Sequence, residues 1–223
     1  METQSTSSIR PVLMASAIIL GIMLILTVVA WIKIPAGQMI ATHSNLRGQP
    51  DAYSNKTVGL LGLPIATLIL AGVFLLLAKI QNLSSVKTIM WVAALTPMVV
   101  LQVIGICNAL GRKLNAITVI WGTLGLLLIV VGNYFPKLRR NRVSGIKTPW
   151  TLSSELSWNK THRIGGPLVM LYGLMTLMSV VFCDPITLFK LIVAGGVLLA
   201  LFLIVYSYIV WKSDPGRSPW LRI

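Results

Sequence analysis

Few residues of this 223-residue chain could do acid–base or metal chemistry, because it contains only two histidines, two cysteines and five Asp or Glu residues. Glu155, Trp158 and His162 are spaced i, i+3 and i+7, so on a helix they share one face. A carboxylate beside an imidazole can exchange protons, but no nucleophile or metal-binding set accompanies this pair. We therefore favour the alternative in which Glu155 bonds the backbone or a cation. His162 and Arg163 then lie at the basic edge of the next apolar segment.

A second polar group lies nearer the N-terminus. His43, Asp51 and Lys56, with Gly48 and Tyr53 between them, could converge in a binding or catalytic site. Turn and surface roles are commoner for such residues in a segment rich in Gly, Pro and Asn. The sequence therefore offers two candidate sites, and neither has a complete catalytic set.

The elements that must position these residues are membrane-spanning helices. Hydrophobic residues make up 56% of the chain and charged residues 11%, and the mean hydropathy of +0.84 is far above that of a soluble domain. The pattern predicts an all-α, polytopic membrane helix bundle. Six apolar runs are long enough to cross a hydrocarbon core of about 30 Å, namely residues 11–32, 58–78, 89–107, 116–135, 164–182 and 191–211. These runs contain no ionisable Asp, Glu, Lys, Arg or His, which argues against a proton-coupled pump.

The net charge of +14 comes from Lys and Arg residues between the apolar runs, so it indicates topology and contact with lipid head groups rather than nucleic-acid binding. With the N-terminus inside, the inner segments hold 13 of the 19 Lys and Arg residues and the outer segments hold 6. This excess predicts that both termini are cytoplasmic. His43 and His162 then lie on opposite sides of the membrane, so we expect no metal site and no cofactor. The predicted divisions begin with a cytoplasmic tail at residues 1–10 and a first pair of helices at 11–78, joined by the outer loop 33–57. A second pair of helices follows at 79–135, and then a basic cytoplasmic loop at 136–163. The last pair of helices and a cytoplasmic tail occupy residues 164–223.

Local signals predict the form of the loops. The outer loop should be a small cap rich in turns. In the inner loop, Thr148 and Pro149 should open a short helix, because the proline ring fixes φ and restricts the residue before it. The apolar residues from Leu152 to His162 lie broadly on one side, so this segment should lie in the membrane interface, with Trp150 and Trp158 at head-group depth.

Within the spans, Pro64 and Pro97 should kink their helices and leave carbonyls for a neighbouring helix, a Thr or water to satisfy. Small residues four apart, such as Gly62 and Ala66, should let helices approach closely. Cys107 and Cys183 both fall at outer helix ends, where a disulfide could form. We favour two unlinked thiols.

The inner loop also carries a motif that resembles a known family. Its string Gly145-Ile146-Lys147-Thr148-Pro149-Trp150-Thr151-Leu152, followed by Trp158, His162-Arg163 and Gly165-Gly166, is similar to the signature of the SdpI family of bacterial membrane proteins. The outer-loop residues resemble the N-terminal domain that often accompanies this signature, namely His43, Gly48, Pro50, Asp51, Tyr53 and Lys56, with Leu63-Pro64 in the next helix. The resemblance covers most of the chain from Pro35 to Gly166. One departure is Ala41, where the family commonly has a proline two residues before its histidine.

The resemblance implies a six-helix protein of the bacterial inner membrane. The best-known member of the family confers immunity to a secreted peptide killing factor and signals by holding a transcriptional repressor at the membrane. We therefore hypothesise an immunity or signalling protein that is not an enzyme. The outer set would meet the toxin or an envelope ligand, and it comprises His43, Gly48, Asp51, Tyr53 and Lys56. The inner set would meet membrane lipids or a cytoplasmic protein such as a repressor, and it comprises Thr148, Pro149, Trp150, Glu155, Trp158, His162 and Arg163.

Two alternatives remain open. One is a membrane enzyme or small-molecule transporter that uses the same polar loops, and it requires His43, Asp51 and Lys56, or Glu155 and His162, to converge in a pocket. The other is a structural protein that organises lipids.

Overall fold

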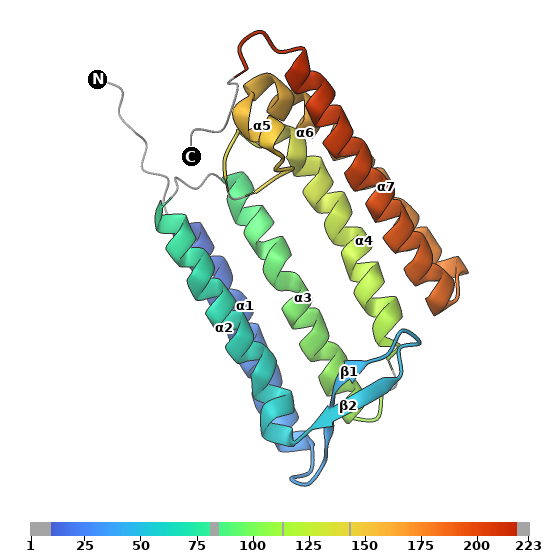
Figure 1. The fold of residues 1–223 in the computed structure, drawn as a ribbon. Coiled ribbons are helices and arrows are strands. Elements are labelled where there is room, and N and C mark those ends of the chain that lie inside the picture. The colour runs from blue at the N-terminus through green and yellow to red at the C-terminus, as the bar shows by residue number, and fades with distance from the viewer. Residues whose placement is uncertain (1–9, 81–84, 113, 143, 218–223) are drawn as a thin grey trace. The chain divides into compact units, whose positions relative to one another are not determined.

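A computed structural model describes residues 10–80, 85–112, 114–142 and 144–217 of the chain. Within these residues, six helices are long and apolar enough to cross a membrane, and together they contain the six predicted spans except for Phe135, which begins a short 3-10 turn. The long helices are α1 (Arg10–Lys33), α2 (Lys56–Ile80), α3 (Ser85–Ala109), α4 (Ala116–Tyr134), α6 (Glu155–Phe182) and α7 (Pro185–Lys212). The short elements are the strands β1 (Ile40–Ser44) and β2 (Pro50–Ser54), the 3-10 turn η1 (Phe135–Lys137) and the helix α5 (Pro149–Ser153) (Figure 1).

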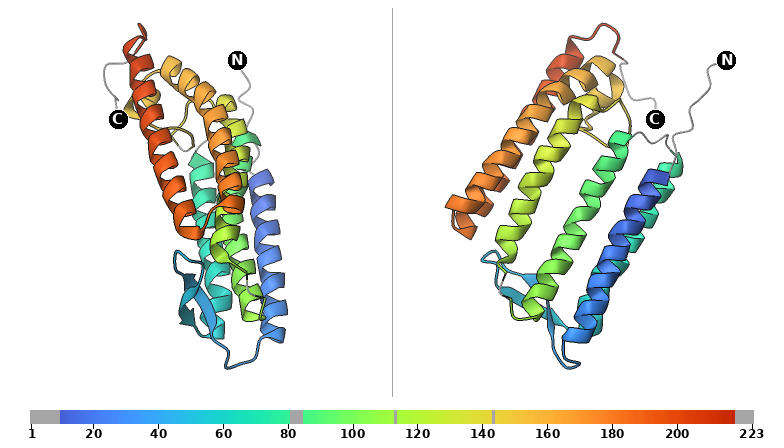
Figure 2. Two further views of the ribbon diagram at one scale, coloured as in Figure 1. Left: turned by 90° about the vertical axis from the view of Figure 1, so that its right-hand side faces the viewer. Right: turned by 180° about the vertical axis from the view of Figure 1, so that it is seen from behind.

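The chain forms two compact units, Met1–Thr123 and Leu124–Ile223. The first contains α1, α2, α3, the β-hairpin and the first turns of α4. Its hairpin lies where α1 ends and α2 begins (Figure 2). The second contains the rest of α4, then η1, α5, α6 and α7. Here η1 and α5 lie at the end of the unit where α6 begins and α7 ends (Figure 2).

A relay of hydrogen bonds joins the three helices of the first unit. Gln102 on α3 donates its Nε2 proton to Thr27 Oγ1 on α1 at 2.7 Å, and Thr27 donates to the carbonyl of Leu60 on α2 at 3.4 Å. Leu60 lies four residues before Pro64, whose missing N–H leaves that carbonyl without its helical partner. Of the partners that the sequence left open for the carbonyl freed by Pro64, the structure therefore shows a side chain of a neighbouring helix.

The outer loop is a β-hairpin, whereas the sequence predicted only a cap of turns. β1 and β2 pair antiparallel, with Ile40 opposite Ser54. The connecting turn uses Gly48 at a φ of 78°, which favours glycine. The hairpin packs directly on α2, because a Cβ added at Gly59 would lie 2.6 Å from the Cβ of Ile40, and Ile40 is buried. The close approach of Ile40 and Gly59 fixes this strand to the helix bundle.

In the second unit, glycines bring α4 and α6 into backbone contact. A Cβ added at Gly132 would lie 2.7 Å from the carbonyl oxygen of Gly166, and one at Gly173 would lie 2.6 Å from that of Gly125. The two contacts are seven residues apart on each helix and run in opposite directions, as antiparallel packing requires. The sequence prediction of close packing at Gly62 was wrong, because a Cβ there meets nothing within 4 Å.

The fifth long helix, α6, begins at Glu155, well before the predicted start at Ile164. The segment predicted to lie separately in the interface is therefore divided between the short helix α5 and the first turns of α6. With 28 residues, α6 is about 42 Å long at 1.5 Å per residue. A hydrocarbon core of about 30 Å accommodates only part of that length. The polar first turns of α6 account for the excess.

Candidate functional site

The centre of the inner motif is a buried pair of rings on α6. Trp158 is 0% exposed and His162 is 1% exposed. Their rings stack with centroids 4.0 Å apart, and Trp158 Nε1 donates to the carbonyl of Leu138 at 2.7 Å. The prediction that Trp158 anchors at head-group depth was wrong. The hydrogen bond from its indole instead joins the segment before α5 to α6.

Both ring nitrogens of His162 are used by the backbone. Nε2 accepts the amide proton of Ile146 at 2.8 Å, so Nδ1, which lies 2.8 Å from the carbonyl of Trp158, carries the ring proton. Gly145 has a φ of +116°, and a Cβ there would lie 2.4 Å from Nε2, so this position requires glycine. Glu155 is exposed, away from the buried ring. The geometry therefore gives His162 a positioning role and does not assemble a Glu–His acid–base pair.

Thr148 begins α5 and ties it to α7. Its Oγ1 accepts from the amide of Thr151 at 3.1 Å, and the Thr151 hydroxyl accepts from the amide of Thr148, which makes a reciprocal cap. The predicted opening of a helix at Thr148–Pro149 is confirmed. Thr151 also donates to the carbonyl of Ile146 at 2.8 Å, and Thr148 Oγ1 lies 3.0 Å from Ser207 Oγ on α7.

Three serines and an aspartate complete the arrangement, and sequence reasoning missed all four. Ser154 caps α6 by accepting from the amide of Ser157, and its hydroxyl donates to Asp214 beyond α7. Ser157 donates to the carbonyl of Ser207 at 2.8 Å. The Ser154 hydrogen bond, the amide of Gly216 and the charge of Arg217 hold the pKa of Asp214 below its usual range. A Ser directly before Glu155 is a typical helix-start signal, so Ser154 was predictable, whereas Ser207 and Asp214 were not.

We call these internally bonded residues the motif cluster, and define it as Gly145, Ile146, Thr148, Thr151, Ser154, Ser157, Trp158 and His162. Other side chains near the motif cluster lie outside it. Glu155, Arg163, Asn159 and Lys160 are exposed on the first turns of α6, and Trp150 packs edge-on against Tyr208 with centroids 5.3 Å apart. The exposed group, rather than the motif cluster, could contact lipids or a protein.

In the outer set, two of the three polar residues meet. His43 Nδ1 lies 2.6 Å from Asp51 Oδ1 across the hairpin, and their side chains are 69% and 42% exposed. Lys56 instead donates to the carbonyls of Trp31 and Ile34 at the end of α1, at 2.6 Å and 2.5 Å. A cation at this helix end stabilises its unpaired carbonyls. The convergence of His43, Asp51 and Lys56 that an enzyme or transporter would require therefore does not form.

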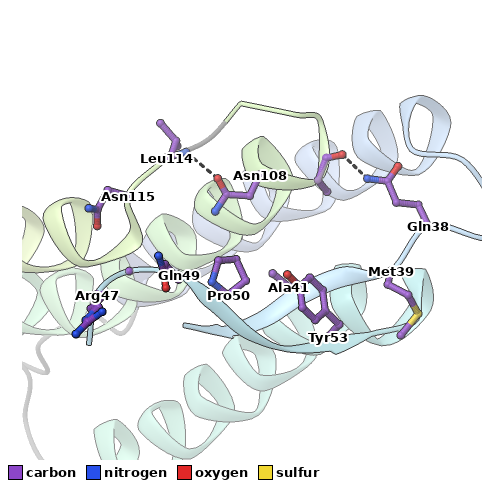
Figure 3. A pocket seen from close by; sticks show the side chains of 12 residues that line it. Gln38, Met39, Ala41, Arg47, Gln49, Pro50, Tyr53, Asn108, Leu114 and Asn115 are labelled. Carbon is purple, nitrogen blue, oxygen red and sulfur yellow. Dashed lines mark hydrogen bonds between the residues drawn. The ribbon is translucent and has the colours of Figure 1, made fainter. Parts of the chain in front are cut away.

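Gly48 and Tyr53 border a cavity of about 550 Å³, which we call the hairpin cavity. Tyr53 comes from β2, and Asn115, which directly precedes α4, also borders the cavity (Figure 3). A Cβ at Gly48 would lie 2.3 Å from the Asn115 side-chain oxygen, so glycine is needed for the turn to pass this close. Tyr53 is 56% exposed. The hairpin cavity is thus open to a ligand, with an aromatic and Arg47 beside it.

Neither cysteine is bonded to the other: Cys107 and Cys183 are free thiols. In the part of the chain that the structure describes, no three His, Cys, Asp or Glu side chains lie together in a way that could hold a metal ion.

Six membrane-spanning helices with polar clusters at their ends define a multi-pass membrane protein. Residues 137–207 match the model of the SdpI/YfhL protein family, and residues 18–68 match a domain of unknown function, DUF1648. The Immunity protein SdpI of Bacillus subtilis (strain 168) is 26% identical over 172 residues, which cover 75% of this chain and 82% of that protein. No solved structure matches the chain. The resemblance to the SdpI family is therefore confirmed, and the chain is a multi-pass bacterial membrane protein.

The two family matches correspond to the two polar sites. The SdpI/YfhL match, 137–207, spans the motif cluster and two of its partners, Leu138 and Ser207. The DUF1648 match, 18–68, spans the hairpin and the relay residues Thr27 and Leu60. The internal bonds explain why the inner motif has this composition, since each of its Gly, Thr, Trp and His residues has a specific structural partner.

Proposed function

We propose that this chain is an immunity protein of the bacterial cell membrane, which protects its cell against a secreted, membrane-active peptide. The named relative, Immunity protein SdpI, supports this class of function. We further propose that the hairpin is the surface that recognises the peptide, and that the motif cluster holds the second unit together.

One contrast carries the second part of the proposal. The motif-cluster residues Trp158 and His162 are buried and bonded to backbone groups, so they cannot contact a partner without unfolding the cluster. The hairpin residues His43 and Tyr53 are exposed, and Tyr53 borders the hairpin cavity. Exposed aromatic residues beside a concave surface are the usual anchors of protein recognition.

The test is protection of a sensitive host that expresses the chain and is challenged with a panel of secreted membrane-active peptides. We expect wild-type cells to survive at least one peptide. Tyr53→Ala should lower the protective affinity by about 2 kcal/mol, or roughly 30-fold, if Tyr53 is an anchor. Arg163→Ala, an exposed change in the inner set, is the matched control. Loss of protection with Arg163→Ala but not with Tyr53→Ala would place recognition at the inner face instead.

Recognition of a secreted peptide also requires the hairpin to face outward. The distribution of Lys and Arg predicts this orientation. Leu46→Cys at the hairpin turn should react with an impermeant thiol reagent in intact cells, in a background where Cys107 and Cys183 are Ser. Asn159→Cys on α6 should react only after the membrane is opened. Labelling of Asn159→Cys from outside would reverse the topology and remove this surface as the toxin site.

A signalling role has its own candidate surface. Glu155, Asn159 and Arg163 are four residues apart and exposed on the turns of α6 that exceed the hydrocarbon thickness. We propose this stripe as the site where a cytoplasmic repressor would bind. Combined alanine substitution of the stripe should keep the reporter repressed even when a resisted peptide is present, because the repressor is no longer held at the membrane, while protection is retained. A reporter that this variant still derepresses as wild type does would refute the assignment.

A further inference from the structure

The hairpin cavity carries charge of one sign. Among the described residues that border it, Arg47 is the one charged side chain, and no Asp or Glu is present. Arg47 is exposed, and its guanidinium has no ion-pair partner in the part of the chain that the structure describes. The other side chains with N–H donors at the cavity are neutral amides, from Gln38, Gln49, Asn108 and Asn115. This composition offers a cation no acidic ligand, and it favours an anionic group.

Two of these amides are held with the NH2 group free. Asn108 Oδ1 accepts from the backbone amide of Leu114 at 2.8 Å. Asn115 Oδ1 accepts from the backbone amides of Ile117 and Thr118 at 3.0 Å and 3.3 Å. Since a backbone N–H only donates, the bonded atom of each side chain is its oxygen, and the other is the NH2 group. In Figure 3 the nitrogen of Asn108 lies on the side of the hairpin, away from Leu114, where it can donate to a ligand in the cavity.

The turn that carries Arg47 is already ordered without a ligand. Asn45 Oδ1 accepts from the amides of Arg47 and Gln49 at 2.9 Å and 3.1 Å, and the Asn45 carbonyl accepts from the amide of Gly48 at 2.9 Å. Gly48 lies against Asn115, since a Cβ there would be 2.3 Å from the Asn115 side-chain oxygen. The backbone at Arg47 and the Asn115 side chain are therefore neighbours. A site ordered in advance loses less conformational entropy when it binds.

We infer that the hairpin cavity binds a carboxylate of the secreted peptide, which accepts from the Arg47 guanidinium and from the NH2 groups of Asn108 and Asn115. A guanidinium pairs with a carboxylate through two parallel N–H···O hydrogen bonds. The carboxylate is the C-terminus of the peptide or an Asp or Glu side chain, because these groups present the same two oxygens. The inference rests on the proposed function, because it identifies the part of the toxin peptide that is recognised.

Two substitutions remove donors and keep the local structure. Arg47→Gln removes an exposed charge, and Arg112→Gln is its matched control, because Arg112 is also exposed and does not border the cavity. Asn115→Asp keeps an oxygen to cap α4, since Asp and Asn are similar caps, but it replaces the NH2 group by an oxygen that repels a carboxylate. Asn55→Asp makes the same change at the cap of α2, where Asn55 Oδ1 accepts from the amide of Val58 at 2.9 Å, and Asn55 does not border the cavity.

The probe is acetyl-Gly-photoleucine with a free C-terminal carboxylate, added to the purified full chain in phosphatidylcholine nanodiscs, with cross-links mapped by mass spectrometry. We expect labelling within residues 38–53, which should fall about tenfold, or about 1.4 kcal/mol, when the C-terminus of the probe is an amide. Arg47→Gln and Asn115→Asp should cause a fall of the same size, whereas Arg112→Gln and Asn55→Asp should leave the labelling unchanged. Acetyl-Asp-photoleucine-amide carries its carboxylate on a side chain, so the stronger of the two charged probes identifies which carboxylate the cavity binds.

Three results would overturn the inference. One is equal labelling by the acid and the amide, and another is labelling of Arg47→Gln at the wild-type level. The third is displacement of the probe by glycerophosphoglycerol, a lipid head group without acyl chains, more strongly than by acetyl-leucine. The cavity would then bind a lipid phosphate.

Protection of cells separates this inference from the proposed function. If cells that express Arg47→Gln survive the challenge peptide as wild type does, and the acid and amide probes label equally, the cavity does not bind a carboxylate and the immunity function stands. If labelling depends on both the carboxylate and Arg47 but no challenge peptide is resisted, the site stands and the immunity function fails.

Discussion

Replacement of His162 by Leu is the sharpest test of the motif cluster. Leucine is similar in volume to histidine but has no polar atom, so it isolates the hydrogen bonds from the packing. The amide of Ile146 would lose its acceptor at 2.8 Å, and the leucine that replaces the buried ring has no group to accept its proton. A buried donor left unpaired costs about 1–3 kcal/mol, and loss of the stacked ring pair with Trp158 adds about 0.5–1.5 kcal/mol. We expect a total destabilisation of about 1.5–4.5 kcal/mol.

The measurement is the free energy of unfolding in mild detergent, followed by tryptophan fluorescence during a denaturant titration. His162→Gln should recover part of the loss, because its side-chain oxygen can take the place of Nε2 as acceptor for the Ile146 amide. Arg163→Leu changes the exposed neighbouring residue and should be nearly neutral. A His162→Leu protein within about 0.5 kcal/mol of wild type would refute the reasoning, because surface substitutions produce changes of that size.

Three further changes test other contacts. In a thermal unfolding assay, Gly166→Ala should separate α4 from α6 and lower stability by about 1–3 kcal/mol, whereas Gly72→Ala should be neutral or stabilising. Thr27→Val should lower stability by about 0.6–1.7 kcal/mol, the scale for hydrogen bonds between membrane helices, because it breaks the relay to Leu60. An unchanged melting temperature would contradict this expectation. Because the pKa of Asp214 is depressed, its ionised carboxylate stabilises the fold at pH values above the ordinary titration range of a carboxylate. The melting temperature should therefore fall on acidification below about pH 4. The fall should be smaller in Asp214→Asn.

The long helices could be predicted from the sequence because their signal is local. An apolar run of about 20 residues has few ways to satisfy its backbone in a membrane other than as a helix. Pro64 was also interpretable, since a missing N–H creates a definite need for a partner. Which neighbour meets that need depends on tertiary packing, so Thr27 could not be identified from the sequence.

The hairpin and the motif cluster were harder to predict because their partners are distant in sequence. Trp158 and His162 looked like interface residues, since an aromatic or imidazole side chain beside basic residues is typical of head-group depth. Their actual partners, Leu138 and Ile146, are 20 and 16 residues away. Only the fold brings these backbone groups within reach. The strands were missed because five-residue segments that contain Pro and Ser give little alternating pattern.

The hydrogen bond between Thr148 and Ser207 can form only after α7 has been translated. The two residues are 59 positions apart, so a ribosome that adds about 5–20 residues per second needs roughly 3–12 seconds to travel from one to the other. During that interval the start of α5 has been made, but its partner on α7 has not. A nascent chain therefore carries an incomplete cluster until the last span emerges, and an arrest within α7 would expose it to quality-control proteases. The final helix thus completes the hydrogen bonds of a motif that was translated several seconds earlier.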